Sequence, residues 1–223
     1  MMKEILAFIL AAFMLLAVVA CTANTAPTDP KSDATDNNTD TSAVTMTAQE
    51  ILDALKKSLG DSYASDSAET EDRMGGYWGL DMSQIESWAA EGDSNSSLNM
   101  DCAVVLKVKD GYAEDAAKLL QQSYEQTLSY ARMYNMDLQR VLQARLFVNG
   151  NYVALLVEGE QADWQASDEE QAKFAADEAA KVDAAWSAIF GTAENSIVIP
   201  ADSGNMNMDE ALEGADGTPI LGG

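Results

Sequence analysis

The chain has 223 residues, of which 37 are acidic and 13 are basic, so its formal net charge is −24. A surface this negative repels nucleic acids and other anionic polymers, and we therefore expect no nucleic-acid partner. The chain contains no His, which excludes Ser-His-Asp and Cys-His catalysis and most zinc sites. Its length suits one domain of ordinary size with additional tails.

The chain begins with an apolar run over residues 5–19. This run is shorter than the roughly 20 apolar residues that a membrane-spanning helix needs, so residues 1–20 are interpreted as a secretory signal. The run ends in Val18-Val19-Ala20-Cys21, which resembles the bacterial lipobox. We expect Cys21 to carry a lipid anchor that holds the protein on the outer face of the cell membrane. The alternatives are a cleaved signal with an incidental Cys and a retained N-terminal helix.

Two polar segments flank the predicted domain. Residues 21–46 are rich in Thr, Asp, Asn and Ala, and such a segment cannot repay the entropy of ordering. They are predicted to form a disordered tether behind the lipidated Cys, with cation binding as the alternative role. Residues 201–223 are rich in Gly, Asp and Asn and are therefore predicted to form a disordered acidic tail. A calcium site is the alternative, but the spacing of their Asp and Asn residues matches no known calcium loop.

The folded domain is predicted over residues 47–200. Its first helix follows the capping box of Thr47 and Glu50 and ends at Gly60, and residues 61–72 then favour a surface loop. Two adjacent aromatic residues follow, Tyr77 and Trp78, in a glycine-rich stretch. They either plug an edge of the core or form a platform on which a sugar or peptide stacks, so they are the candidate binding residues.

Alternating apolar residues predict the sheet. The pattern over residues 85–90 favours a short strand over a helical turn, and residues 99–109 predict a clearer strand. Cys102 begins that strand and is interpreted as a small buried side chain, with a reactive thiol as the alternative. Asn149-Gly150 between residues 141–148 and 151–158 predicts a β-hairpin with a type I′ turn. Its returning strand is apolar on both faces and should therefore be central.

Helical periodicity predicts two further helices and completes the fold class. One covers residues 112–135, and the other covers residues 168–190 between the capping residue Ser167 and Gly191. Residues 197–199 suit a short edge strand before Pro200. The sequence therefore predicts a single α+β domain, in which a small antiparallel sheet of about four strands packs against two or three helices around the hairpin.

Several of these features together resemble a family of clostridial-type lipoproteins that carry a domain of unknown function. The resemblance rests on the lipobox, the tether, Tyr77-Trp78-Gly79-Leu80-Asp81, the strand end at residues 107–111 and the hairpin sequence over residues 149–157. It covers roughly residues 47–158, and the helix after Glu160 is longer and more acidic than the ending of the family pattern. The resemblance implies a small extracytoplasmic α+β domain and supplies no catalytic residues.

No catalytic motif is recognisable in the sequence, which has no phosphate-binding Gly-Lys-Ser/Thr loop and no nucleophile elbow. We therefore expect a non-enzymatic binding or interaction module without cofactor or metal. Its partners would be the membrane, through the lipid, and an unidentified protein or small molecule, and we expect a monomer. The alternative is a carboxylate-dependent cell-envelope hydrolase, which needs two carboxylates that converge in a pocket.

The lipobox generates the first testable prediction. Cys21→Ser removes the sulfur that receives the lipid, so the variant should leave the membrane or remain unprocessed. Detergent-phase partitioning and mass spectrometry of the membrane fraction measure both outcomes. A variant that enters the detergent phase and is cleaved like the wild type would place the anchor elsewhere.

Overall fold

A five-stranded antiparallel sheet forms the centre of the computed structural model, which describes residues 44–94, 99–135 and 137–202. The strands lie in the order β1-β2-β3-β5-β4, and every neighbouring pair is antiparallel. Their bounds are β1 (Ser67–Ala68), β2 (Ile85–Gly92), β3 (Cys102–Val108), β4 (Arg145–Asn149) and β5 (Tyr152–Val157). The predicted α+β class is confirmed, with one strand more than expected.

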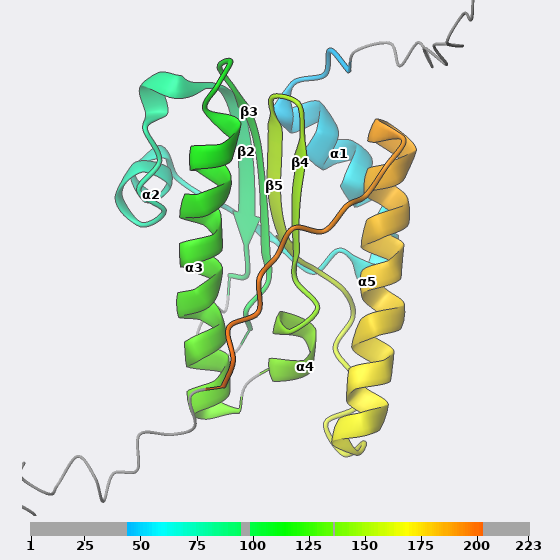
Figure 1. The fold of residues 1–223 in the computed structure, drawn as a ribbon. Helices are drawn as coiled ribbons and strands as arrows, with labels where there is room; N and C mark the ends of the chain where they lie inside the picture. Colours follow the sequence, from blue (N-terminus) through cyan, green and yellow to red (C-terminus); the bar gives the residue numbers. More distant parts are fainter. Residues whose placement is uncertain (1–43, 95–98, 136, 203–223) are drawn as a thin grey trace, which may run out of the picture. The chain divides into compact units, whose positions relative to one another are not determined.

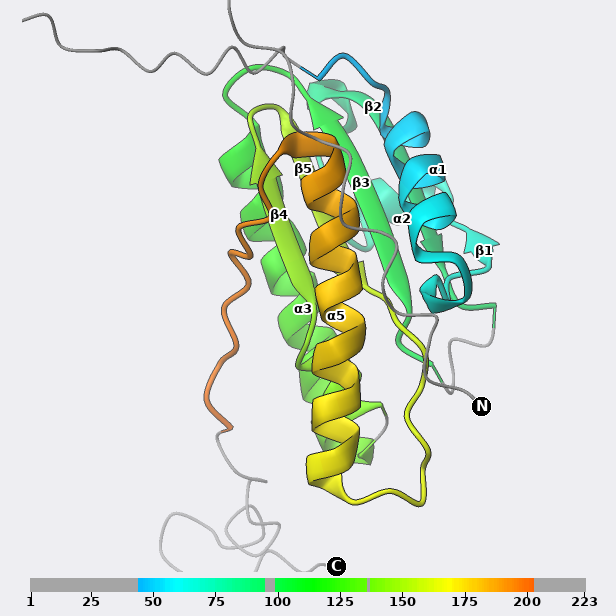
Figure 2. The ribbon, with the colours of Figure 1, turned by 90° about the vertical axis from the view of Figure 1, so that its right-hand side faces the viewer.

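Helices cover both faces of the sheet (Figure 1). The long α3 (Ala113–Tyr134) lies on one face, with α2 (Glu71–Gly76) and α4 (Leu138–Val141) near it. On the opposite face α1 (Ala48–Leu59) and α5 (Asp168–Phe190) lie side by side, as Figure 2 shows. The result is a three-layer arrangement with two hydrophobic cores, one on each side of the sheet.

The two central strands explain this arrangement. In β3, Val104, Leu106 and Val108 face the core under α3, whereas Ala103 and Val105 face the core under α1 and α5. All six residues of β5 are buried and divide between the two cores in the same alternating way. A strand that is apolar on both faces has to be covered twice, because successive side chains point to opposite faces.

The two predicted capping boxes and the predicted end of α5 are confirmed. Thr47 and Glu50 form the capping box of α1, and Ser167 and Glu170 form that of α5, with each side chain accepting a hydrogen bond from the backbone N–H of the other. Gly191 ends α5 in the left-handed conformation. These local signals were sufficient because capping bonds join residues that are only three positions apart.

Several details of the sequence prediction are wrong. Residues 61–72 are not only a loop, since they contain β1 and the start of α2. Residues 141–144 precede β4, because Val141 belongs to α4 and the strand starts at Arg145. The hairpin is not at the centre of the sheet: β5 is internal, but β4 lies at the edge and β3 in the middle.

The turn of the hairpin also differs from the prediction. Asn149 pairs with Tyr152, so Gly150 and Asn151 are the two central residues of the turn. Gly150 has a φ of +59°, whereas Asn151 is not among the described residues with positive φ. A single positive φ at the first central position is typical of a type II′ turn and not of the type I′ turn that Asn-Gly suggested.

The C-terminal edge is thinner than predicted. Instead of a strand at residues 197–199, a single antiparallel bridge joins Phe147 and Asn195. The side-chain oxygen of Asn195 accepts a hydrogen bond from the backbone N–H of Leu146, and the backbone N–H of Ser196 donates to the Leu146 carbonyl oxygen. These contacts hold the segment against β4, but the described residues that follow it form no regular β-ladder.

The predicted signal, Cys21 and the tail over residues 203–223 lie outside the described residues, as does the tether up to residue 43. Residues 44–46 of the predicted tether contact the domain, since the Tyr152 hydroxyl lies within hydrogen-bond distance of the carbonyl oxygens of Val44 and Met46. Within the described part of the chain, no helix has the length and apolar character to cross a membrane.

The hairpin turn yields the second testable prediction. Gly150→Val places a β-branched residue at positive φ, which should lower the free energy of unfolding by about 1–3 kcal/mol in urea denaturation. A Cβ at Gly150 would meet no atom within 4 Å, so the loss would come from the backbone alone. Gly76→Val is the matched control, because that exposed helical glycine has open space and no positive φ. Equal stability of both variants would contradict the turn geometry.

Candidate functional site

A cleft of about 380 Å³ opens beside α3 at the end of the sheet where β3 begins and β5 ends. Its walls come from α2 and the residues after it, from α3, and from the first residue of β3 with the segment that precedes it. The side chains that matter for its chemistry are Glu69, Arg73, Tyr77, Trp78, Asp101, Cys102, Tyr124 and Tyr130. This cleft contains both aromatic residues that the sequence singled out.

Tyr77 and Trp78 line the same cleft but differ in burial. Trp78 is 5% exposed and belongs to the core under α3, whereas Tyr77 is 49% exposed. Their rings meet edge to face with centroids 5.9 Å apart. The guanidinium of Arg73 lies 4.5 Å from the Tyr77 ring centroid and 6.0 Å from that of Trp78. Each interpretation of the pair therefore applies to one residue: Trp78 plugs the core, and Tyr77 offers an exposed ring for binding.

Two tyrosines of α3 add to the aromatic lining. Tyr130 is 44% exposed. Tyr124 is only 1% exposed, and its hydroxyl has no hydrogen-bond partner among the residues that the structure describes. A buried phenol normally finds such a partner. The sequence analysis had no reason to single out these residues, because Tyr124 falls on the inward stripe of an amphipathic helix and is indistinguishable there from any large core residue.

Cys102 contributes a thiol to the cleft. The residue is half-buried, at the first position of β3. Burial raises the pKa of its thiol to about 12, and the nearby carboxylate of Glu158 acts in the same direction. The group is therefore a neutral thiol at physiological pH and a weak nucleophile.

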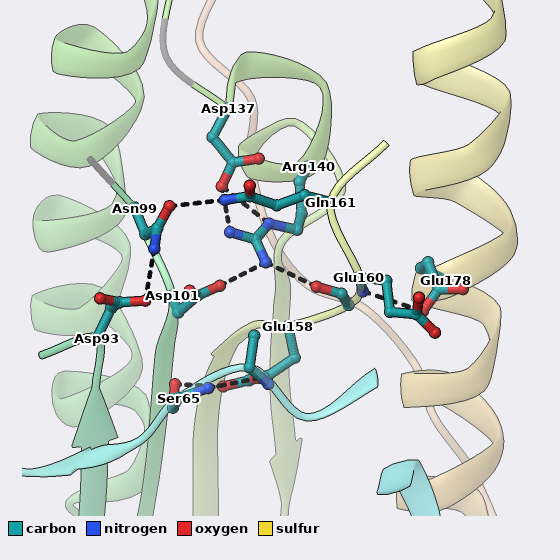
Figure 3. Close-up of polar contacts among 12 residues, drawn as sticks. Ser65, Asp93, Asn99, Asp101, Asp137, Arg140, Glu158, Glu160, Gln161 and Glu178 are labelled. Atoms are coloured by element: carbon teal, nitrogen blue, oxygen red, sulfur yellow. Dashed lines mark hydrogen bonds and ion pairs between the residues drawn. The ribbon is translucent and has the colours of Figure 1, made fainter. Parts of the chain in front are cut away.

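Figure 3 shows a buried ionic cluster around Arg140. One member of this cluster, Asp101, also lines the cleft. Arg140 is 4% exposed, and its Nη1 atom lies 2.5 Å from Asp101 Oδ1. The same guanidinium donates hydrogen bonds to Asp137 Oδ2 and, over 2.6 Å, to the Gly159 carbonyl oxygen. Arg140 thus joins the segment before β3, the start of α4 and the chain after β5.

Glu158 is the third carboxylate of this Arg140 cluster, which we define as Asp101, Asp137, Arg140 and Glu158. It accepts hydrogen bonds from the backbone N–H of Ala64 at 2.6 Å and from the Ser65 hydroxyl at 2.5 Å. Burial raises its pKa despite these bonds. The carboxylate therefore ties the end of β5 to the segment before β1.

The charges of the Arg140 cluster do not balance when all its carboxyl groups are ionised. The cluster would then hold three carboxylates and one guanidinium, all largely shielded from solvent. Burial raises the pKa of Asp101 to about 8, against the lowering effect of Arg140, and burial also raises the pKa of Asp137. Asp101 Oδ1 makes its ion pair without a hydrogen bond of regular geometry. Burial therefore favours the protonated form of Asp101, and Arg140 opposes it.

No match to the chain emerges from comparisons with known protein families, with curated proteins and with solved structures. The resemblance to clostridial-type lipoproteins stays a prediction from the sequence. In the described ranges there is also no group of three or more Cys, Asp or Glu side chains arranged to hold a metal ion.

The different burial of the two aromatic residues gives the third testable prediction. Trp78→Ala empties part of the core and should lower the free energy of unfolding by about 3–5 kcal/mol. Tyr77→Ala removes an exposed ring and its contact with Arg73, and should cost about 1 kcal/mol or less. Urea denaturation of the two variants and the wild type measures the difference. Equal losses would contradict the placement of Trp78 in the core and Tyr77 outside it.

The raised pKa of Asp101 gives the fourth testable prediction. Its ordinary pKa is 3.8 and its folded pKa is about 8, so between these values the folded chain binds a proton that the unfolded chain has released. The contribution of this group to the free energy of unfolding therefore falls as pH rises through that window, with a limiting slope of about 1.4 kcal/mol per pH unit.

Asp101→Asn should remove this slope, because Asn keeps the shape of the protonated acid without titrating. The measurement is the difference in unfolding free energy between variant and wild type at several values from about pH 5 to about pH 9, which cancels the other titrating groups. Asp115→Asn, on the exposed surface of α3, is the control and should leave the profile unchanged. A difference that is independent of pH would contradict the raised pKa of Asp101.

Proposed function

We propose that this protein is a lipid-anchored, extracytoplasmic binding module whose cleft beside α3 holds a small molecule. The observation that carries the proposal is the cleft itself, in which two exposed rings, Tyr77 and Tyr130, lie on one hollow with the unpartnered hydroxyl of Tyr124. Exposed aromatic rings offer large contact areas at a low entropic cost, and buried polar groups provide specificity. The volume, about 380 Å³, is in the range of small-molecule sites, roughly 300–1,000 Å³.

The carboxylates of the cleft support binding over hydrolysis. Glu69 and Asp101 both line it, but Glu69 is 3.1 Å from Arg73 Nε and Asp101 is 2.5 Å from Arg140 Nη1. A carboxylate-pair hydrolase needs one acid that delivers a proton to the substrate and one carboxylate that attacks or activates water. Glu69 and Asp101 are both paired with arginines, so neither is free to act as the acid or the nucleophile of a hydrolase. We therefore favour a binding site and keep the cell-envelope hydrolase as the alternative.

The location of the module rests on the sequence alone. The apolar run that ends in Val18-Val19-Ala20-Cys21 supports a lipid anchor at Cys21 on the outer face of the cell membrane. The net charge of −24 supports a ligand other than nucleic acid or an anionic polymer.

Protein-observed NMR with a set of small aromatic amines, alcohols and carboxylates tests the proposal. At least one of these probes should shift the signals of Tyr77, Tyr130 and Cys102 at millimolar concentration. The double variant Tyr77→Ala/Tyr130→Ala should lose the shift at Cys102 while melting near the wild-type temperature. Tyr134→Phe is the control, because Tyr134 is exposed on the same helix, does not line the cleft and keeps its ring against Tyr130 in this variant. If no probe shifts the cleft residues, the proposed function is overturned.

A further inference from the structure

The chemistry of the cleft identifies the class of small molecule that would fit it. Four aromatic rings line the cleft, two from the chain at the end of α2 and two from α3: Tyr77, Trp78, Tyr124 and Tyr130. The face of an aromatic ring carries partial negative charge, so rings gathered around one hollow attract a cation. Aromatic cages of this kind are a known means of recognising organic ammonium groups.

The cleft already shows this preference in its own side chains. The guanidinium of Arg73 lies over the rings of Tyr77 and Trp78, and its charge is balanced by the Glu69 carboxylate at 3.1 Å. Tyr130 makes no contact with a cationic group of the described chain, and its ring contact is with Tyr134. The ring of Tyr130 is therefore available for a cation from outside.

Charge also favours a cationic ligand. Glu69 is paired with Arg73, and Asp101 is paired with Arg140 and has a raised pKa, so the lining itself carries little net charge. The field at the cleft comes from the whole chain, whose formal net charge is −24. A protein this negative concentrates cations and repels anions.

The hydroxyl of Tyr124 makes the ligand class more specific. It is buried in the cleft wall, and no described group donates a hydrogen bond to it or accepts one from it. The oxygen has free lone pairs but almost no exposed surface, so a ligand reaches it only when the ring turns towards the cleft. A primary ammonium group can then use the lone pairs as acceptors, because it carries three N–H donors. A quaternary ammonium group has no such donor and would leave the hydroxyl unpartnered.

We propose that the cleft recognises the primary ammonium group of a small organic amine. The ammonium group lies against the aromatic faces of the lining, donates a hydrogen bond to Tyr124 Oη, and is attracted by the carboxyl of Asp101. The apolar part of the amine then contacts Tyr77 and Tyr130 at the mouth of the cleft. This inference rests on the proposed function, since it names the ligand of the same site.

Four related probes test the inference by isothermal titration in about 0.15 M salt, which screens long-range attraction to the acidic surface. They are phenethylamine, 2-phenylethanol, phenylacetate and N,N,N-trimethylphenethylammonium, which share a phenyl ring and a short chain. Phenethylamine should bind at least about tenfold more tightly than the alcohol and the trimethylated cation, and phenylacetate should not bind measurably. The two cations have the same charge, so their difference reports the N–H donors.

The matched variants are Tyr124→Phe and Tyr134→Phe. Tyr124→Phe removes only the unpartnered oxygen, so it should melt no lower than the wild type and should weaken phenethylamine binding about tenfold. The same variant should leave binding of the trimethylated cation unchanged. Tyr134→Phe keeps a ring that lies outside the cleft and should bind every probe like the wild type.

Each contrary outcome has a distinct meaning. If 2-phenylethanol binds as tightly as phenethylamine, the ligand is neutral, and the amine assignment is overturned while the binding function stands. If Tyr124→Phe binds phenethylamine like the wild type, or melts lower, the hydroxyl serves water or the fold and its assigned role is overturned. If no probe of either polarity binds and the cleft signals stay unshifted, the amine assignment and the proposed function fall together.

Discussion

The constraint on which the structure depends is that β3 and β5 are apolar on both faces. A strand of this kind leaves no face for solvent, so the chain has to supply a helical layer on each side of the sheet. On one side α1 and α5 share the task, and on the other α3 carries most of it. The layer beside α3 is completed by the short helices α4 and α2, and α2 ends after six residues at Gly76. The cleft lies where this second layer is incomplete, so it is a consequence of how the sheet is covered.

The Arg140 cluster closes the same end of the molecule by a different interaction. A buried ion pair gains little net stability, because desolvation of its charges offsets their attraction. Its effect here is positional: one guanidinium holds Asp101 before β3, Asp137 before α4 and the Gly159 carbonyl after β5. The ion pair with Arg140 thereby fixes the position of the Asp101 side chain in the cleft wall. The excess of carboxyl groups over cations also makes the protonation of Asp101 sensitive to its neighbours.

Local signals in the sequence predicted local structure well. The capping residues Thr47 and Ser167, the terminal Gly191 and the alternation around Val104 each specify an element through residues a few positions apart. The edge position of β4 was not predictable in this way, because strand order depends on pairings between distant segments. The turn type was missed for a related reason, since the pairing of Asn149 with Tyr152 determines which two residues form the turn.

The candidate site could be predicted only in part. Tyr77 and Trp78 were visible as adjacent aromatics in a glycine-rich stretch, but their opposite burial depends on how α2 packs on the sheet. Tyr124 resembles any inward residue of α3 until the lack of a partner for its hydroxyl is seen in three dimensions. Asp101 and Arg140 are far apart in the sequence, and nothing local relates them. The sequence therefore indicated the aromatic residues of the candidate site but not the polar groups beside them.

The chemistry of the cleft and the Arg140 cluster are coupled through Asp101. Burial favours the protonated form of this carboxyl, whereas a cation in the cleft favours the ionised form. By linkage, an ammonium ligand that approaches Asp101 would displace its proton, and part of the binding energy would be used to ionise the acid. Binding of an amine would therefore strengthen as pH rises towards the pKa of Asp101. The same buried cluster that fixes the geometry of the cleft would in this way set the pH range over which the cleft is filled.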